Sequence, residues 1–101
     1  MSNESYMYLF TRRDLSHQQQ IIQTAHATHQ MASKHKEEEI PNAVLIGIHS
    51  ADSLYEMGDY LQQNNIPFEI FYEPDIDAHT AIATYPLRGK ERKPLLKFGL
   101  M

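Results

Sequence analysis

The sequence contains no cysteine, which excludes disulfides, thiolate metal sites and cysteine nucleophiles. No apolar run reaches the roughly 18 residues that a membrane span requires, and the polar N-terminus does not have the pattern of a signal peptide. The few glycines are not spaced as in a phosphate-binding loop, and neither Ser16 nor Ser53 lies in a nucleophile-elbow motif. We therefore expect a soluble cytoplasmic protein outside the serine hydrolase and nucleotide-triphosphatase classes.

Charge is distributed unevenly along the chain. Apolar residues make up 42% of the 101 residues and charged residues 22%, as in ordinary globular domains. Five of the nine basic residues but only one of the thirteen acidic residues lie in positions 88–101. These basic residues are Arg88, Lys90, Arg92, Lys93 and Lys97. We expect one domain over residues 1–101, with a core at about 6–87 and a basic tail at 88–101 that either binds an anion such as RNA or folds back on the acidic body.

Hydrophobic periodicity predicts the element order β-α-β-α-β-β. Strands are expected at 6–11, 43–48, 67–72 and 79–85, and the first helix at 15–36, capped by Asp14 or Ser16. A second helix, capped by Ser50 or Asp52, ends at residues 64–65. The continuous apolar run at 43–48 predicts a central strand covered on both faces. The fold class is therefore α/β, a small mixed four-stranded sheet with helices packed on it.

Two faces of the first predicted helix differ in character. The residues expected to pack on the sheet are apolar, namely Leu15, Ile22, Ala25 and Ala32. Beside them runs a polar stripe at steps of four, three and four, formed by Gln19, Gln23, His26 and Gln30. This stripe either lines a ligand groove or merely faces solvent. No carboxylate joins His26 and His29 at a matching step, so we expect neither a metal nor a cofactor.

A second polar cluster lies between the last two predicted strands. It contains Glu73, Asp75, Asp77, His79 and Thr80. Loops at strand ends often carry function, and a carboxylate there can act as a general base. The alternative is an acidic turn, shaped by Pro74, that only keeps a hairpin soluble.

Three segments carry a resemblance to a known family. They are Arg13-Asp14-Leu15, Gln23-Thr24-Ala25-His26-Ala27 and Val44-Leu45-Ile46. Together with the strand that holds Thr80, they make the chain resemble the type II peptidyl-tRNA hydrolases of archaea and eukaryotes over most of residues 6–85. The similarity is strongest to short phage-borne and bacterial relatives of these enzymes.

This resemblance implies hydrolysis of the ester that joins a peptide to the 3′ end of tRNA. It places the family's threonine at Thr80 and its aspartate at Asp75, or at Glu73 or Asp77 if the turn is shifted. The family's lysine falls on Gln19 or Gln18, neither of which carries a charge. Arg12 and Arg13 are the nearest cations that could replace it.

Three functions follow as expectations. As an enzyme, the protein uses His26, Asp75 and Thr80 for catalysis and binds tRNA phosphates with cations, namely Arg13, Arg88, Lys90 and Arg92. As a binding module, it holds a nucleotide-like ligand, a tRNA end or a partner protein at the Gln19, Gln23 and His26 stripe and at Thr80. As a structural protein, it shares only the fold. We also expect a homodimer, supported by the apolar tail residues Leu95, Leu96, Phe98 and Leu100, in the host cytoplasm if a phage encodes the chain.

Overall fold

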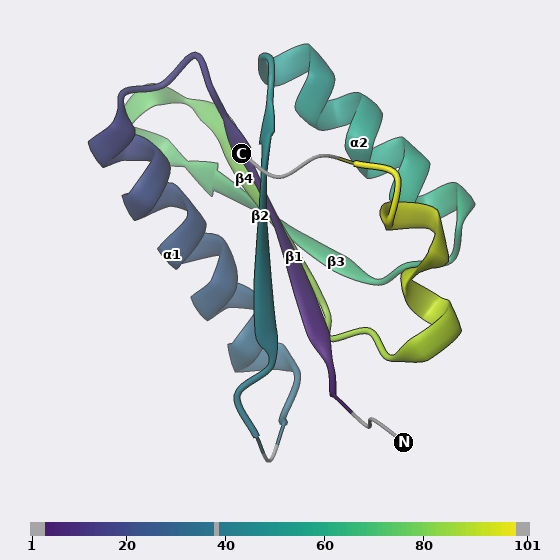
Figure 1. The fold of residues 1–101 in the computed structure, drawn as a ribbon. Coiled ribbons are helices and arrows are strands. Elements are labelled where there is room, and N and C mark those ends of the chain that lie inside the picture. Colours follow the sequence, from purple (N-terminus) through teal and green to yellow (C-terminus); the bar gives the residue numbers. More distant parts are fainter. Residues whose placement is uncertain (1–3, 38, 99–101) are drawn as a thin grey trace.

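The computed structural model describes residues 4–37 and 39–98 and contains one open four-stranded sheet (Figure 1). In chain order the regular elements are β1 (Tyr6–Arg12), α1 (His17–Lys34), β2 (Asn42–Ile48), α2 (Ala51–Gln63), β3 (Phe68–Glu73), the 3-10 turn η1 (Pro74–Ile76), β4 (Ala78–Thr84) and the 3-10 segment η2 (Gly89–Leu95). The strand order is β2-β1-β4-β3, with β1 parallel to β2 and β4 antiparallel to both β1 and β3. The predicted mixed α/β fold is therefore confirmed.

The two α-helices cover opposite faces of the sheet (Figure 1). Alternation along β1 sends Tyr8 and Phe10 towards α2, and Met7 and Leu9 towards α1. The larger core lies on the α2 side and contains Phe10, Ile46, Leu54, Leu61, Ile82 and Leu95 among its buried residues. The α1 side is built from smaller residues, namely Ala27, Met31, Ala81 and Ala83. Small side chains on this side allow α1 to approach the sheet closely.

Serine caps fix where both helices begin. Ser16 has an extended backbone, and its hydroxyl accepts a hydrogen bond from the Gln19 amide, so α1 begins two residues later than predicted. Ser50 caps α2 in the same way, through the Ser53 amide. The helix α1 ends at Lys34 because His35 already has extended backbone angles.

The strand β2 lies at an edge of the sheet, which corrects the prediction that it is central. Its residues Val44, Ile46 and Ile48 pack in the core on the α2 side. On the other face, Leu45 remains 41% exposed. An uninterrupted apolar run shows that a strand is apolar on both faces, but it does not show that both faces are covered.

The buried face of α1 also differs from the predicted one. Its buried residues are Gln20, Gln23, Ala27 and Met31, whereas Ile22, Ala25 and Ala32 are exposed. Burial of the two amides is tolerated because each is hydrogen-bonded. The Gln20 Nε2 group donates to the Leu15 carbonyl at 2.8 Å, and Gln23 is bonded to the sheet side as described below.

The basic tail folds back onto the domain rather than extending from it. Leu95 is 1% exposed in the larger core, so the core continues beyond the predicted limit at residue 87 and Leu95 is not free to support a dimer. The Arg92 guanidinium lies 3.5 Å from the centre of the Tyr6 ring, and its Nε donates to the Tyr8 hydroxyl at 2.9 Å. Arg88 is paired with Glu37 at 3.0 Å. Leu100, the last residue of the expected dimer contact, lies outside the described residues.

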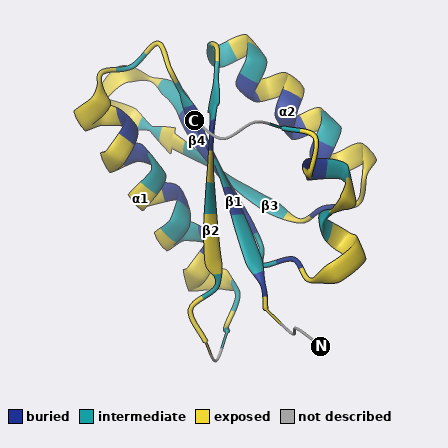
Figure 2. Ribbon diagram, in the orientation of Figure 1, coloured by how far each residue is buried: buried dark blue, intermediate teal, exposed yellow. Residues whose placement is uncertain are grey.

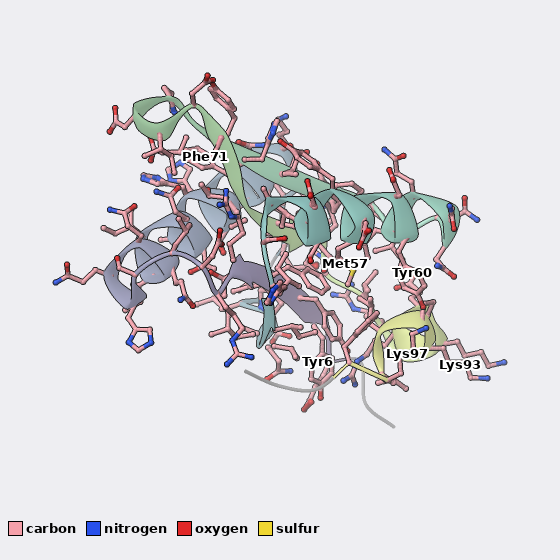
Figure 3. The ribbon with its side chains drawn as sticks, turned by 90° about the horizontal axis from the view of Figure 1, so that it is seen from above. Tyr6, Met57, Tyr60, Phe71, Lys93 and Lys97 are labelled. Atoms are coloured by element: carbon pink, nitrogen blue, oxygen red, sulfur yellow. The ribbon has the colours of Figure 1, made fainter. Side chains whose placement is uncertain are left out.

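Figures 2 and 3 show the tail segment from two directions. Exposed residues line the outer side of η2, where Lys93 points away from the fold. Lys97 instead lies over the Tyr60 ring, with its Nζ 4.9 Å from the ring centre. The tail is thus an integral part of the fold, held by one buried leucine and by cation–π contacts.

Two neighbouring leucines test the role of this segment. We expect Leu95→Ala to lower the free energy of unfolding by about 2–5 kcal/mol, because it leaves a cavity in the core. Leu96, which is 60% exposed, is the matched control, and Leu96→Ala should change stability by less than about 0.5 kcal/mol. Urea denaturation measures both changes, and equal effects would contradict the packing described for η2.

Candidate functional site

The buried amide of Gln23 connects α1 to the end of the β3–β4 hairpin. Its Oε1 accepts a hydrogen bond from the Thr80 hydroxyl at 2.9 Å. Its Nε2 donates to Gln19 Oε1 and to Glu73 Oε1, each at 3.0 Å. Gln23 is only 1% exposed, so these three bonds replace water around a polar group in the interior. The structure therefore brings together Gln19, Gln23, Glu73 and Thr80 from three different elements.

An irregularity in β4 aims Thr80 at this amide. Phe71 pairs with Ala81 and Tyr72 pairs with His79, so Thr80 has no direct partner on β3. Such a bulge changes the side-chain alternation, and here both Thr80 and Ala81 face α1. Thr80 is 0% exposed, and its hydroxyl hydrogen is used by Gln23. The hydroxyl therefore does not face solvent.

Glu73 supplies the negative charge of the network. Its Oε1 accepts from Gln23, and its Oε2 accepts from the backbone amide of Asp75 at 3.3 Å. The hydrogen bond from the Gln23 amide, helped by the Asp75 amide and by the nearby His26, lowers the pKa of the Glu73 carboxyl. The side chain of Asp75 is exposed on η1, so Glu73 rather than Asp75 is the carboxylate that contacts Gln23.

The polar stripe of α1 faces the hairpin. The exposed His26 ring stacks on Phe71, with ring centres 4.8 Å apart and planes 21° apart. One turn later, Gln30 donates to Glu69 Oε1 and to the Ile70 carbonyl. The stripe thus has two buried or half-buried amides that bond to the sheet, and an exposed rim formed by Gln19 and His26. The sequence analysis did not identify Phe71 as the stacking partner of His26, although it placed Phe71 in an alternating strand.

The two arginines at the end of β1, Arg12 and Arg13, do not complete the network. Arg12 forms an ion pair with Asp14 at 2.7 Å and donates to the His79 carbonyl at 3.0 Å. The side chain of Arg13 is exposed, and its backbone amide donates to the Ile48 carbonyl. Of the two positions that the resemblance offers for a lysine, Gln18 and Gln19, both are neutral, and Gln19 contacts Gln23 directly.

The expected tail residues lie at the other end of the sheet. Leu87 pairs with Tyr6 at the start of β1, whereas the carbonyl of His79 contacts Arg12 at the end of β1. Seven strand residues separate these points by about 20 Å. Because β4 carries the chain away from the network, the structure does not bring Arg88, Lys90 and Arg92 together with Thr80.

A separate aromatic cluster lies on the α2 face near the same turn. The Tyr55 hydroxyl and His79 Nδ1 are 2.9 Å apart, and Tyr72 packs edge-on against the His79 ring. The Tyr72 hydroxyl donates a hydrogen bond to the side chain of Asp77, and Asp77 is the residue of the turn that has left-handed backbone angles. The predicted cluster of Glu73, Asp77, His79 and Thr80 is thus divided between the two faces of the sheet.

The described residues contain no group of three or more side chains placed to hold a metal ion. In the same part of the chain, no helix has the length and apolar character needed to cross a membrane.

Comparison with known proteins identifies the fold but not an activity. No protein-family model matches the chain, and no curated protein matches it either. A solved structure of Atu0240, a protein of unknown function from Agrobacterium tumefaciens C58, superimposes with a TM-score of 0.70 over 99% of each chain at 12% identity. At this identity the likeness concerns the arrangement of helices and strands alone.

Two buried threonines test the network. Thr80→Val leaves the Gln23 carbonyl oxygen without its donor, and we expect it to lower the free energy of unfolding by about 1–3 kcal/mol. Thr11, which is 1% exposed, is the matched control, because its hydroxyl has no partner among the described residues. Thr11→Val should be neutral or stabilising in the same thermal or urea denaturation, and the reverse order of effects would contradict the network.

The lowered pKa of Glu73 predicts how stability depends on pH. A carboxyl whose pKa is lower in the folded state stabilises the fold above its unfolded pKa, and this contribution is lost as the pH falls through the folded pKa. Carbon NMR of the Glu73 carboxyl should show a pKa below the ordinary glutamate range. In Gln23→Leu, which removes the main donor, the Glu73 pKa should rise towards that range, and an unchanged pKa would exclude the amide as the cause.

Proposed function

We propose that this chain binds a nucleotide-like ligand, such as the terminal nucleotides of a tRNA 3′ end, at the exposed rim of the Gln23 network, and that it does not cleave the ester there. One observation carries the proposal: the Thr80 hydroxyl is fully buried against Gln23, in a network whose third amide is the neutral Gln19. The site therefore keeps groups that recognise a ligand and lacks the cation that would accelerate hydrolysis.

The electrostatics of the network disfavour ester cleavage. Attack on an ester builds negative charge on the carbonyl oxygen, and donors or cations stabilise that charge. In this network the ionised group is the Glu73 carboxylate, which has the opposite effect. Arg12 is used by Asp14 and His79, so it does not substitute for a lysine.

The exposed rim and the half-buried Phe71 and Glu73 beside it match the chemistry of a nucleobase. The stacked pair of His26 and Phe71 offers an aromatic surface on which a base can stack. The Gln19 amide and the Glu73 carboxylate can bond to the edges of an unpaired base. Single-stranded ends are the form of RNA that presents such edges.

Charge limits how much of the ligand contacts this surface. Glu73, Asp75 and Asp77 surround the turn, and a long phosphate backbone would be repelled by them. The exposed side chain of Arg13 is the cation that follows β1, and it can contact a single phosphate. A short, terminal ligand therefore fits better than a length of duplex RNA.

Hydrolysis is the second candidate, and a specific observation favours it. The resemblance associates Thr80 and Asp75, or Glu73 if the turn is shifted, with the reaction, and Gln23 on α1 is hydrogen-bonded to both Thr80 and Glu73. If the chain hydrolyses the ester, the missing positive charge must come from Arg13 or from a cation that binds together with the substrate.

Fluorescence anisotropy with a labelled trinucleotide of the tRNA 3′ end tests binding. We expect the unmodified protein to bind and His26→Ala to weaken the affinity by about 10-fold, because one stacking contact is lost. His17→Ala replaces an exposed histidine nine residues earlier, on the opposite side of the same helix, and should leave the affinity unchanged. Equal affinities for the three proteins, or no binding by any of them, would refute the proposed surface.

Release of peptide from an N-blocked aminoacyl-tRNA separates the two functions. We expect no release by the unmodified protein, and release by Gln19→Lys, which places an ammonium group beside the network. Hydrolysis by the unmodified protein that is lost in Arg13→Gln would establish the second candidate instead.

A further inference from the structure

The hydrogen bonds of the Gln23 network have a fixed direction. A carboxylate has no hydrogen to donate, so the Gln23 atom that contacts Glu73 must be the amide nitrogen, and the Gln23 oxygen must face the Thr80 hydroxyl. The same nitrogen donates its second hydrogen to Gln19 Oε1. The amide of Gln19 is therefore held with its oxygen towards Gln23 and its nitrogen directed away from Gln23.

This direction determines what the rim presents to a ligand. Gln19 is exposed, and its amide nitrogen has no hydrogen-bond partner among the described residues, so it offers a donor. Glu73 is half-buried, and its two oxygens accept from Gln23 and from the Asp75 amide. A carboxylate has about four lone pairs, so Glu73 can accept further hydrogen bonds but cannot donate one. The rim thus combines one donor with one negatively charged acceptor.

The donor and the acceptor lie close enough to contact the same base. Gln19 Oε1 and Glu73 Oε1 are each 3.0 Å from the Gln23 nitrogen, so these two oxygens lie within twice that distance of each other. Phe71, on which the His26 ring stacks, and Glu73 both face α1 and are two residues apart on β3. Two residues of a strand span about 7 Å, and a hydrogen-bond partner lies on the order of 6 Å from the centre of the base that it contacts. Stacking and edge recognition can therefore act on one base.

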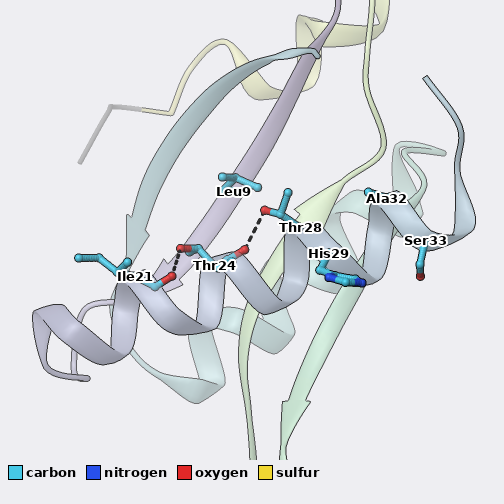
Figure 4. Close-up of a pocket in the computed structure, with 8 residues that line it drawn as sticks. Leu9, Ile21, Thr24, Thr28, His29, Ala32 and Ser33 are labelled. Atoms are coloured by element: carbon cyan, nitrogen blue, oxygen red, sulfur yellow. Dashed lines mark hydrogen bonds between the residues drawn. The ribbon is translucent and has the colours of Figure 1, made fainter. Parts of the chain in front are cut away.

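The cavity on the opposite side of α1 does not offer a comparable pair of groups (Figure 4). It has a volume of about 590 Å³, and no carboxylate or amide side chain lines it. The hydroxyls of Thr24 and Thr28, which do line it, donate to carbonyls of their own helix. Recognition of a base edge is therefore better served by the Gln23 network than by this larger cavity.

The four RNA bases differ in what they present to such a pair. Cytosine and adenine have an exocyclic amino group beside a ring nitrogen that accepts, so the amino group can donate to Glu73 while Gln19 donates to the ring nitrogen. Guanine presents a carbonyl oxygen and two neighbouring N–H groups. Uracil has a single N–H group on this edge, and that group lies between two carbonyl oxygens. A carboxylate that accepts from it meets a carbonyl oxygen, and the like partial charges repel each other.

We propose that Glu73 selects bases that carry an exocyclic amino group and discriminates against uracil. This inference rests on the proposed function, because it concerns the same rim and the same single-stranded ligand. Glu73 is then a specificity-determining residue. Gln23 is a positioning residue, since its nitrogen holds both rim groups and its side chain is buried.

Fluorescence anisotropy with labelled trinucleotides of cytidine and of uridine tests the selection. The two bases are pyrimidines of the same size, so the comparison changes the hydrogen-bonding edge and little else. We expect the unmodified protein to bind the cytidine trinucleotide about 10-fold more tightly. Equal affinities would overturn the selection and leave the proposed binding surface intact, whereas binding of neither trinucleotide would refute both.

Two glutamates on β3 identify the residue responsible. Glu73→Gln replaces the carboxylate by an amide that can donate to a uracil oxygen, so the preference for cytidine should fall to about 2-fold or less. Glu69→Gln is the matched control, because Glu69 is also half-buried on β3 but bonds to Gln30 and Lys34, and it should keep the preference. Circular dichroism verifies that both variants are folded. A preference that survives in Glu73→Gln, or that is lost only in Glu69→Gln, would exclude Glu73 as the determinant.

Discussion

Close packing of α1 on β4 depends on the burial of one amide, that of Gln23. A buried amide is costly unless its oxygen and nitrogen are both bonded, and here the sheet side supplies the partners through Thr80 and Glu73. The bulge in β4 makes this possible, since regular alternation would not aim both Thr80 and Ala81 at α1. Helix, hairpin and bulge are thus fixed by the same set of hydrogen bonds.

The position of α1 follows from this constraint. Hydrogen bonds from Gln23 and Gln30 reach Glu73 and Glu69 at the two ends of β3, so the helix lies over the hairpin half of the sheet. Its most apolar residues then point to the open half or to solvent. The uncovered face of β2 is a direct consequence of using polar residues to anchor the helix.

Much of the fold was predictable from local patterns, and the errors have a common physical origin. Strand and helix order follows from periodicity and from the caps Ser16 and Ser50, which act within a few residues. The predicted buried face of α1 was wrong because hydrophobicity ranks Ile22 above Gln23, whereas the partners of Gln23 on the sheet, Glu73 and Thr80, lie 50 and 57 residues away in the sequence. The prediction that β2 is a central strand was wrong for the same reason, since the neighbours of a strand in a sheet are not determined by its own sequence.

The candidate site shows the same division between local and distant information. The polar stripe on α1 and the acidic turn were each visible in the sequence, and the structure joins them through Gln23 and Glu73. The position of the basic tail could not be predicted from composition, because Arg92 is held by Tyr6 and Tyr8, and Arg88 by Glu37, through contacts that exist only in the folded chain. An excess of positive charge in a segment therefore predicts a nucleic-acid contact only after its intramolecular partners have been subtracted. Exposed cations of this segment, such as Lys90, lie at the other end of the sheet from the Gln23 network, so the ligand binding that we propose there depends more on stacking and base edges than on phosphate charge.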